Sequence, residues 1–281
     1  MSTATATAAP HQHSEIGRLS FLRVLRSEWI KLVTLRSTFW TLVGVLVLIV
    51  GLSALLSAVV PEASVLEQRA ASAQAGSAFV TRAATAGLTF APLVIAVLGV
   101  LAISGEFSTG MIRSSFAAVP HRFPVFAGKA IVLFVVSGLV GLISLTASWA
   151  IAVPLLTSKG YKGDFFSDST LWSILGGAAF LGLVAVFALG VGAIVKASAG
   201  GIAITLGVLF LLPIIVALLE ALLPAQTWIR DWSHYLLSEG GNGMAGLGNG
   251  TLEPWQNILT VAIWGAVSFI VGAILLQRRD A

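Results

Sequence analysis

Few side chains in this sequence could carry out acid–base or nucleophilic chemistry. The chain has 281 residues, with 12 acidic residues, 4 histidines and no cysteine. One carboxylate, Glu220, falls within a long apolar run, where an ionisable group is a candidate for handling a proton or a substrate. Glu220 lies close to the end of that run, so its side chain could equally point into lipid headgroups.

The catalytic motifs that are recognised by their spacing do not occur. There is no HExxH metal motif, no GxSxG nucleophile elbow and no pair of carboxylates within the apolar runs. Gly128 and Lys129 are adjacent, but Phe123 stands five positions before Gly128 and Ala130 follows Lys129. They therefore do not form a GxxxxGK[ST] phosphate loop. We expect no enzyme activity, no catalytic residue and no metal or cofactor site in this chain.

The polar stretch at residues 105–129 separates two strongly apolar runs and has a helical pattern of its own. Apolar residues recur in it at spacings near 3.6, which is typical of a short amphipathic helix. These residues are Phe107, Met111, Ile112, Phe116 and Val119, and polar residues that include Glu106 and Arg113 fill the other positions. Ser108 or Thr109 could cap the start of this helix, and Pro120 should end it.

Composition indicates an integral membrane protein with an all-α fold. Hydrophobic residues make up 57% of the sequence and charged residues 10%, against roughly 25% charged in a soluble domain. Six runs reach the length of about 20 residues that a helix needs to cross a bilayer. The predicted spans cover residues 38–60, 86–103, 130–156, 171–195, 197–223 and 255–276. Residues 19–281 are expected to form a single transmembrane domain, with bends at Pro92, Pro154 and Pro213.

The fourth predicted span is rich in glycine. Small residues in a membrane helix mark faces where two backbones approach closely, within one chain or between chains. The glycines are Gly176, Gly177, Gly182, Gly190 and Gly192. Lys196 is the one charge in the turn between the fourth and fifth spans, so we expect that turn to be short.

The segment before the first span has an interfacial pattern. Residues 19–36 place an apolar stripe on one helical face, with Lys31 among the polar residues opposite, as in a helix that lies at the membrane surface. The stripe consists of Leu22, Leu25, Trp29 and Leu32. The alternative is a cytosolic extension of the first span. Residues 1–18 are small and polar, which predicts a disordered tail. His11 and His13 in it could hold a stray metal ion, although such a pair is more often incidental.

Aromatic residues gather in the segment between Pro224 and Pro254. Trp228, Trp232 and Tyr235 favour the headgroup level of a bilayer. We expect short helices that dip into the outer leaflet, followed by a flexible glycine-rich return over residues 240–250. The alternative is an ordinary solvated loop whose aromatic side chains pack on the ends of neighbouring spans.

Basic residues are distributed unequally between the two sides of the predicted bundle. Eleven Lys and Arg lie before the first span, between spans two and three, between spans four and five, and after the sixth, against five in the other three loops. The richer side is cytoplasmic by the positive-inside rule, so both termini and residues 105–129 are expected there. The net charge of +4 is therefore an orientation signal, and no nucleic-acid binding is expected.

Three segments carry a family resemblance: LRSEWIKLVTLRSTFW at residues 25–40, GEFSTGMIRSSFAAVPHRFPVFAGK at residues 105–129, and the closing LLQRRDA. They resemble permease subunits of the type-2 ATP-binding-cassette (ABC) transporter family, in particular small bacterial exporters. The glutamate-aromatic-x-x-glycine step at Glu106, Phe107 and Gly110 is characteristic of that family. The resemblance covers the whole chain and implies a location in the bacterial cell membrane.

The resemblance also implies roles for individual segments. Residues 19–36 would be an elbow helix, residues 228–237 an external re-entrant element, and residues 108–118 a coupling helix seated in a cleft of a separate ATPase subunit. The expected contacts with that ATPase are Glu106, Phe107, Thr109, Gly110, Met111, Ile112, Arg113 and Phe116. Two copies of the permease would pair with two ATPase subunits, and ATP and magnesium would bind to the ATPase.

Two functions from different classes fit these observations. The first is a permease that exports an amphiphilic or lipid-like compound and is driven by the separate ATPase, because a bundle with so few charges in its spans has no evident means of energising transport itself. The alternative is a non-transporting membrane scaffold or sensor that uses residues 105–129 to dock a cytoplasmic regulator. An apolar cavity would not identify the substrate.

Overall fold

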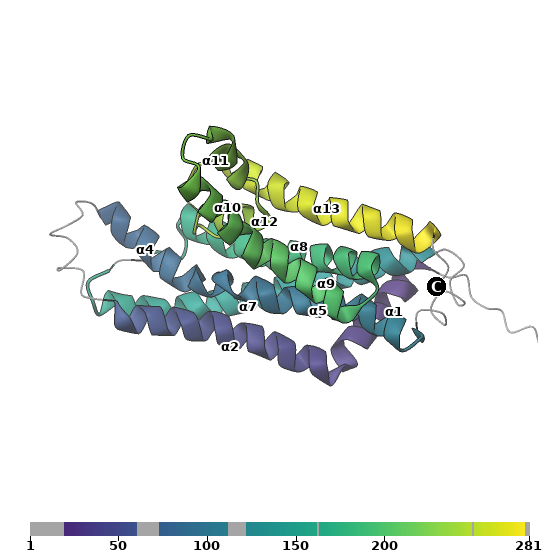
Figure 1. The fold of residues 1–281 in the computed structure, drawn as a ribbon. Coiled ribbons are helices and arrows are strands. Elements are labelled where there is room, and N and C mark those ends of the chain that lie inside the picture. The colour runs from purple at the N-terminus through teal and green to yellow at the C-terminus, as the bar shows by residue number, and fades with distance from the viewer. Residues whose placement is uncertain (1–19, 61–72, 112–121, 162, 249, 279–281) are drawn as a thin grey trace, which may run out of the picture.

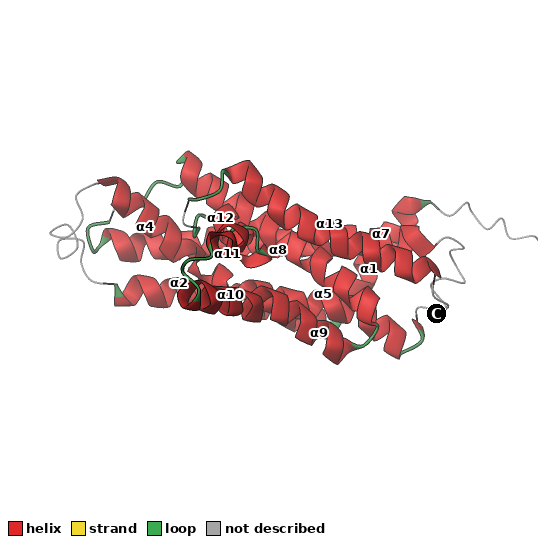
Figure 2. Ribbon diagram, turned by 45° about the horizontal axis from the view of Figure 1, so that its top comes forward, coloured by secondary structure: helices red, strands yellow, loops and turns green. Residues whose placement is uncertain are grey.

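The computed structural model describes residues 20–60, 73–111, 122–161, 163–248 and 250–278, and over these ranges it is built from helices and turns without a β-strand (Figure 2). The all-α prediction is confirmed. Six helical segments are long and apolar enough to cross a membrane: Arg36–Val59, Phe79–Ser108, Phe123–Thr157, Asp168–Val195, Ser198–Leu222 and Pro254–Arg278. The chain is a multi-pass membrane protein by this criterion. The predicted tail at residues 1–18, with His11 and His13, lies outside the described residues.

The long helices run alongside one another, so the bundle has two ends. The first half contains α1 (Phe21–Thr34), α2 (Arg36–Val59), α4 (Ala73–Thr85), η1 (Ala86–Thr89), α5 (Ala91–Ser108) and α7 (Arg122–Thr157). The second half contains α8 (Asp168–Val195), α9 (Ser198–Leu206), η2 (Gly207–Leu211), α10 (Leu212–Leu222), α11 (Thr227–Ser233), α12 (Leu237–Met244) and α13 (Pro254–Arg278). Helix α1 and the last turn of α13 lie at one end, here called the α1 end, and α11 and α12 lie at the other, the α12 end (Figure 1).

Helix α8 is the centre of the bundle and packs against α5, α7 and α13. Its glycines allow these close contacts. A Cβ atom on Gly176 would lie 2.2 Å from the carbonyl oxygen of Met244, and one on Gly190 would lie 2.5 Å from the carbonyl carbon of Ser268. The predicted close approach at the glycine-rich face is confirmed, and at these positions it occurs within the chain.

The second and third spans are longer than predicted at the α1 end. Helix α5 continues to Ser108 and α7 begins at Arg122, so Glu106 and Lys129 both lie on helices that extend the spans. Ser108 is the last residue of α5, and Thr109 follows it. Their hydroxyl groups donate to the carbonyl oxygen of Gly105 at 2.9 and 2.8 Å, and Thr109 is the C-cap of α5. Hydroxyl groups that bond backward in this way satisfy carbonyls at a helix end.

The helix type changes beside Pro92 and Pro213, whereas Pro154 lies inside α7, which is a single helix. In the second span a 3₁₀ turn, η1, precedes α5, and Pro92 occupies the first turn of α5, where its missing N–H would have no partner in any case. In the fifth span the π-helical segment η2 precedes α10, and Pro213 lies in the first turn of α10. A π segment inserts extra residues into a helix and often accompanies a bend.

Two capping lysines fix turns at opposite ends of the bundle. Lys196 has a φ of 61° and ends α8, so the turn to α9 is short, as predicted. Lys159, just after α7, donates from Nζ to the carbonyl oxygens of Ser57, Ala58 and Val60 at 3.0, 2.7 and 2.6 Å. These are carbonyls that the end of α2 leaves without helical partners, and a cation there also complements the helix dipole.

The prediction of a flexible return over residues 240–250 is wrong for its first part, because residues 240–244 belong to α12. The glycines there are packed rather than free. A Cβ atom on Gly241 would lie 2.1 Å from the ring of Phe180, and Gly246 takes a positive φ of 71° beside Ser173. Arg82 of α4 also donates to the carbonyl oxygen of Leu247 at 3.2 Å. Glycine is used here because the α12 backbone contacts α8 directly.

Candidate functional site

Four ionisable side chains from three helices meet at the α1 end. They are Glu28 and Lys31 of α1, Glu106 of α5 and Lys129 of α7, and together they are called the ion cluster below. Lys129 Nζ donates to Glu28 Oε2 at 2.5 Å and to Glu106 Oε1 at 2.9 Å. Lys31 Nζ donates to Glu28 Oε1 at 2.7 Å and to Glu106 Oε1 at 3.2 Å. The cluster therefore joins α1 to the facing ends of α5 and α7.

The ion cluster is buried and balanced in charge. Glu28, Glu106 and Lys129 are 3%, 7% and 5% exposed, and two carboxylates face two ammonium groups. A buried charge is costly unless it is paired and hydrogen-bonded. Each member of the cluster meets this requirement through the others, so its geometry depends on all three helices being in place.

Close packing of α1 on α7 brings the charges together. A Cβ atom on Gly128 would lie 3.2 Å from Val24 Cγ1, so this glycine lets α1 approach the start of α7. The inward face of α1 then carries Val24, Glu28 and Leu32, which are spaced four residues apart as one helical face requires.

The face of α1 that packs inward includes only part of the predicted apolar stripe. Leu32 is buried and Leu25 packs against the core, but Leu22 and Trp29 are exposed, and Lys31 is half-buried in the ion cluster rather than opposite the packed face. Glu28 lies on the inward face, where it pairs with Lys129, and Leu22 and Trp29 lie on the outward face. This position leaves Leu22 and Trp29 available to lipid.

Electrostatic pairing shifts the pKa values of two side chains of α1, Glu28 and Lys31. Burial by itself would raise the pKa of Glu28, but Lys129 and then Lys31 hold the pKa below its usual value. Burial by itself would lower the pKa of Lys31, but Glu28 and Glu106 hold that pKa above its usual value. Both shifts favour the charged forms, so α1 is most firmly attached when both groups are ionised.

The melting temperature of the solubilised chain is expected to fall toward both extremes of pH. The contribution of Glu28 is complete above its unfolded pKa of about 4.3 and is lost as pH falls through the lower folded value. The contribution of Lys31 is complete below about 10.4 and is lost as pH rises through the higher folded value. Between neutral and acidic pH, the melting temperature of Glu28→Gln should fall by less than that of the wild type. An equal fall in the two proteins would contradict the assignment.

A cavity of about 380 Å³ lies beside the ion cluster. Its charged wall is the ion cluster itself, and its other walls come from α1, α2, α5 and α7. The remaining lining residues are mostly apolar: Leu32, Leu35, Ser37, Thr38, Thr41, Leu98, Leu101, Ala102, Gly105, Thr109, Met111 and Val132. Among them Leu35, Leu101 and Met111 are exposed, so the cavity is open on the side of the bundle. An apolar pocket with a few polar groups at one wall is the usual form of a small-molecule site.

The predicted ATPase contacts divide between this site and the chain that follows. Glu106 is in the ion cluster, Thr109 and Met111 line the cavity, and Gly110 takes a φ of 72° after α5. Phe107 is half-buried, with Lys196 Nζ 5.1 Å from its ring centroid. The remaining predicted contacts, Ile112, Arg113 and Phe116, lie outside the described residues.

The aromatic residues of the predicted re-entrant element lie on α11 and in the turn after it. Trp228, Trp232 and Tyr235 are exposed, whereas Ile229 and Leu236 are buried with Val216. The indole N–H of Trp264 donates to the carbonyl oxygen of Tyr235 at 3.0 Å, which ties this segment to α13. The short helices are therefore present, with their aromatic rings turned outward.

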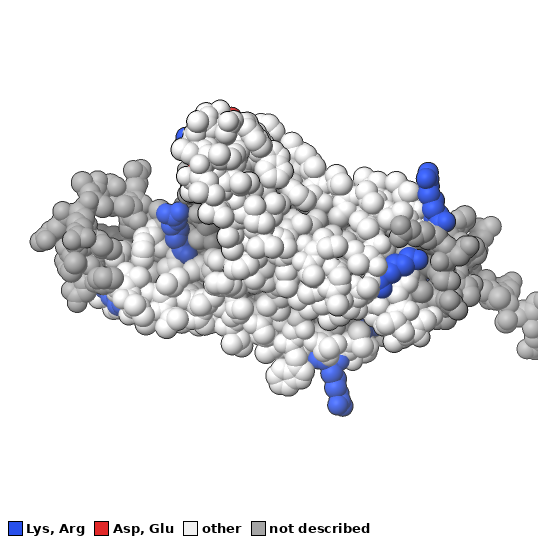
Figure 3. Space-filling model, in the orientation of Figure 1, with Lys and Arg blue, Asp and Glu red and all other residues white. Residues whose placement is uncertain are grey.

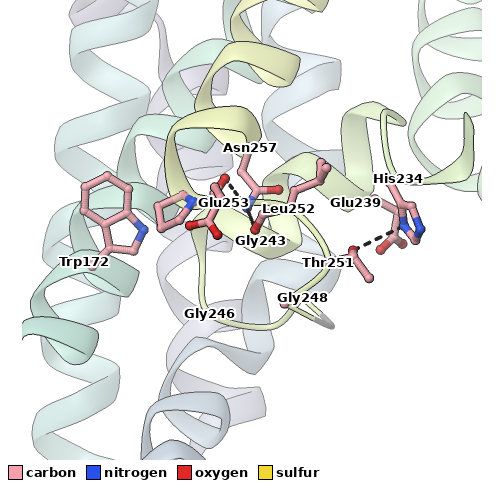
Figure 4. Close-up of a pocket in the computed structure, with 12 residues that line it drawn as sticks. Trp172, His234, Glu239, Gly243, Gly246, Gly248, Thr251, Leu252, Glu253 and Asn257 are labelled. Atoms are coloured by element: carbon pink, nitrogen blue, oxygen red, sulfur yellow. Dashed lines mark hydrogen bonds between the residues drawn. The ribbon is translucent and has the colours of Figure 1, made fainter. Parts of the chain in front are cut away.

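A second cavity, of about 330 Å³, lies at the α12 end. Trp172 and His234 are on opposite sides of it, with Glu253 and Asn257 between them (Figure 4). His234 and Thr251 are 3.3 Å apart, and Asn257 donates to the carbonyl oxygen of Glu253 at 3.4 Å. No group of three potential metal ligands occurs in the part of the chain that the structure describes. The first contact joins Thr251 to the C-cap of α11, and the second lies at the start of α13.

Glu220, the predicted intramembrane candidate, is on α10 near the α12 end. Its Oε1 is buried and has no hydrogen-bond partner among the described residues. The other carboxylates of this end, such as Asp168 and Glu239, belong to different helices. Glu220 is thus separate from the ion cluster.

Charged side chains keep to the two ends of the bundle. On the face shown in Figure 3, Lys and Arg project near both ends, and the middle is free of them. Among described residues the α1 end carries Arg23, Arg26, Lys31, Arg36, Lys129, Lys196 and Arg278, and the α12 end carries Arg82, Lys159 and Arg230. A basic excess at the α1 end is the pattern that the positive-inside rule associates with the cytoplasmic side.

The pattern of the sequence did not single out Glu28 or Lys129 as partners. A possible signal was present, since Glu28 and Lys31 are three residues apart on one helix, and Glu106 and Lys129 bracket one polar stretch. Along the chain, Lys129 is 101 residues from Glu28 and 23 residues from Glu106. Only the packing of α1 across the bundle end shows that the two pairs are one site.

Comparison with protein-family models finds no match for this chain, and comparison with curated protein sequences finds none either. Its function must therefore be inferred from its own residues and their geometry.

Proposed function

We propose that the chain is the membrane-spanning permease subunit of an ATP-driven exporter for an amphiphilic or lipid-like compound. Two copies would act with two separate ATPase subunits of the ABC type, in a bacterial cell membrane and with the α1 end in the cytoplasm. ATP and magnesium would bind to the ATPase. The resemblance at residues 25–40 and 105–129 and the basic excess at the α1 end support this proposal.

The observation that carries the proposal is that the ion cluster joins α5 and α7, the helices that precede and follow residues 112–121 in the sequence. Glu106 precedes this segment on α5 and Lys129 follows it on α7, and the two side chains are bonded at 2.9 Å. Glu28 joins the same cluster from α1. A force applied by a partner to the segment would thus reach α1, α5 and α7 together, as a rigid-body movement requires.

The proposal is tested by ATP turnover in a purified complex of this chain with an ABC ATPase encoded beside it. Ile112→Asp places a charge in the proposed apolar contact, and Gly110→Pro forces a negative φ where the chain has a φ of 72°. We expect each variant to lower turnover at least about tenfold or to prevent assembly, because a buried unpaired charge costs several kcal/mol. Ile112→Leu, which keeps the contact apolar, should behave as the wild type.

Unchanged turnover in both Ile112→Asp and Gly110→Pro would overturn the role of this segment. A complex that assembles normally but shows neither ATP turnover nor transport would instead favour the scaffold or sensor function.

A further inference from the structure

The cavity at the α1 end has one wall with spare hydrogen-bond acceptors. Glu106 Oε1 accepts from both Lys31 and Lys129. Glu106 Oε2 accepts from no donor in the described part of the chain, and it is not among the buried atoms that lack a partner. Because Glu106 lines the cavity, this oxygen is accessible from it.

The donors of the ion cluster are more fully used than its acceptors. Each ammonium group has three N–H donors, and each carboxylate has about four lone-pair sites. Lys31 and Lys129 each donate to both carboxylates. The unused capacity lies mainly on the carboxylates, so a ligand that brings N–H donors fits this wall better than one that brings further acceptors.

The rest of the cavity suits an apolar body. Leu32, Leu98 and Val132 form its walls, and its volume of about 380 Å³ is within the range of small-molecule sites. Its exposed rim residues, Leu35 and Leu101, lie on the side of an apolar bundle. A molecule lying in the adjacent bilayer leaflet could therefore enter sideways, with its polar group at the level of the bundle end.

We propose that this cavity binds a protonated amphiphilic amine, with its apolar part among Leu32, Leu98 and Leu101 and its ammonium group donating to Glu106 Oε2. This names the substrate class of the transporter proposed above and takes its physiological meaning from that proposal. A charge-assisted N–H···O bond in an apolar cavity is among the stronger polar contacts. It would also add a donor to the carboxylate that joins α5 to α1 and α7.

Binding is tested with three dansyl probes on the full chain in lipid nanodiscs without an ATPase. The probes share the fluorophore and a five-carbon chain that ends in an ammonium group, a methyl group or a carboxylate. Dansyl emission reports entry into the apolar cavity. We expect the ammonium probe to bind at least about tenfold more tightly than the methyl probe, and the carboxylate probe to bind most weakly.

Two variants separate the roles of charge and of space. Glu106→Gln should abolish the preference for the ammonium probe. Because Glu106→Gln could also loosen α1, Leu101→Trp provides a second test that narrows the cavity and leaves the ion cluster intact; it should weaken the ammonium probe at least about tenfold. Ile131→Trp is the matched control, since Ile131 is 45% exposed against 44% for Leu101 and does not line the cavity. It should bind all probes as the wild type does.

Equal affinity for the ammonium and methyl probes, tighter binding of the carboxylate probe, or equal effects of Leu101→Trp and Ile131→Trp would overturn the amine site. The amine site and the transporter function can be rejected independently. Selective amine binding without ATP-dependent transport would support the site and reject the transporter. Transport of a neutral or anionic amphiphile without amine binding would support the transporter and reject the site.

Discussion

Replacing Lys129 with methionine is expected to destabilise the chain by about 3–5 kcal/mol, the usual effect of removing one partner from a buried ion pair. The variant leaves Glu28 and Glu106 at 3% and 7% exposure with Lys31 as the remaining cation of the cluster. The excess negative charge would then be buried where water cannot solvate it. The change should appear as a large fall in melting temperature in detergent.

The double variant Lys129→Met, Glu28→Gln provides the control for this prediction. It removes one charge of each sign and leaves Lys31 paired with Glu106. Because an ion pair replaced on both sides often costs little, the double variant should melt well above Lys129→Met. A cycle built from these variants measures the coupling between the two side chains directly. If Lys129→Met melted at the wild-type temperature, the ion cluster would not hold α1 in place.

Gly190→Ala is expected to disrupt the contact between α8 and α13. The added Cβ would lie 2.5 Å from the carbonyl carbon of Ser268 and 2.6 Å from its carbonyl oxygen. These are backbone atoms within a helix, which cannot rotate away as a side chain can, so the helices must separate. Overpacking of this kind costs about 1–3 kcal/mol, and the loss should be visible as a lower melting temperature.

Gly51→Ala is the matched control for Gly190→Ala. Gly51 lies within α2, and a Cβ atom there would meet nothing within 4 Å. Since alanine favours a helix over glycine by about 1 kcal/mol, Gly51→Ala should be neutral or slightly stabilising. Equal melting temperatures for the two variants would show that the α8–α13 contact tolerates a methyl group and that the close approach is not required.

The number and order of the spans could be predicted because they depend on length and hydrophobicity alone. Helix ends were less predictable, since Glu106 and Lys129 interrupt the apolar pattern and were placed outside the second and third spans. The structure shows that they belong to those helices and neutralise each other's charge. A hydrophobic pattern treats each residue separately, so it cannot recognise that two distant charges are buried as a pair.

Three of the residues expected to contact an ATPase, Glu106, Thr109 and Met111, lie at the ion cluster and its cavity. Their role as ATPase contacts stays a prediction. Glu28 was missed because the prediction for its helix used only the positions of the apolar residues. The contact with Lys129 depends instead on how α1 crosses the bundle. The glycine-rich face of α8 was predicted correctly, since close backbone contact is the main use of clustered glycine in membrane helices. The roles expected of Ile112, Arg113 and Phe116 stay predictions.

Helix α7 is one continuous helix of 36 residues, which corresponds to about 54 Å at 1.5 Å per residue and exceeds the roughly 30 Å of a bilayer's hydrocarbon layer. At its start Lys129 binds α1, and just beyond its last turn Lys159 holds the end of α2. Helices α1 and α2 are therefore attached to opposite ends of α7. If α7 tilts, its two ends move in opposite directions. An inward displacement of one end of α7 on one side of the membrane would then move its other end outward on the opposite side.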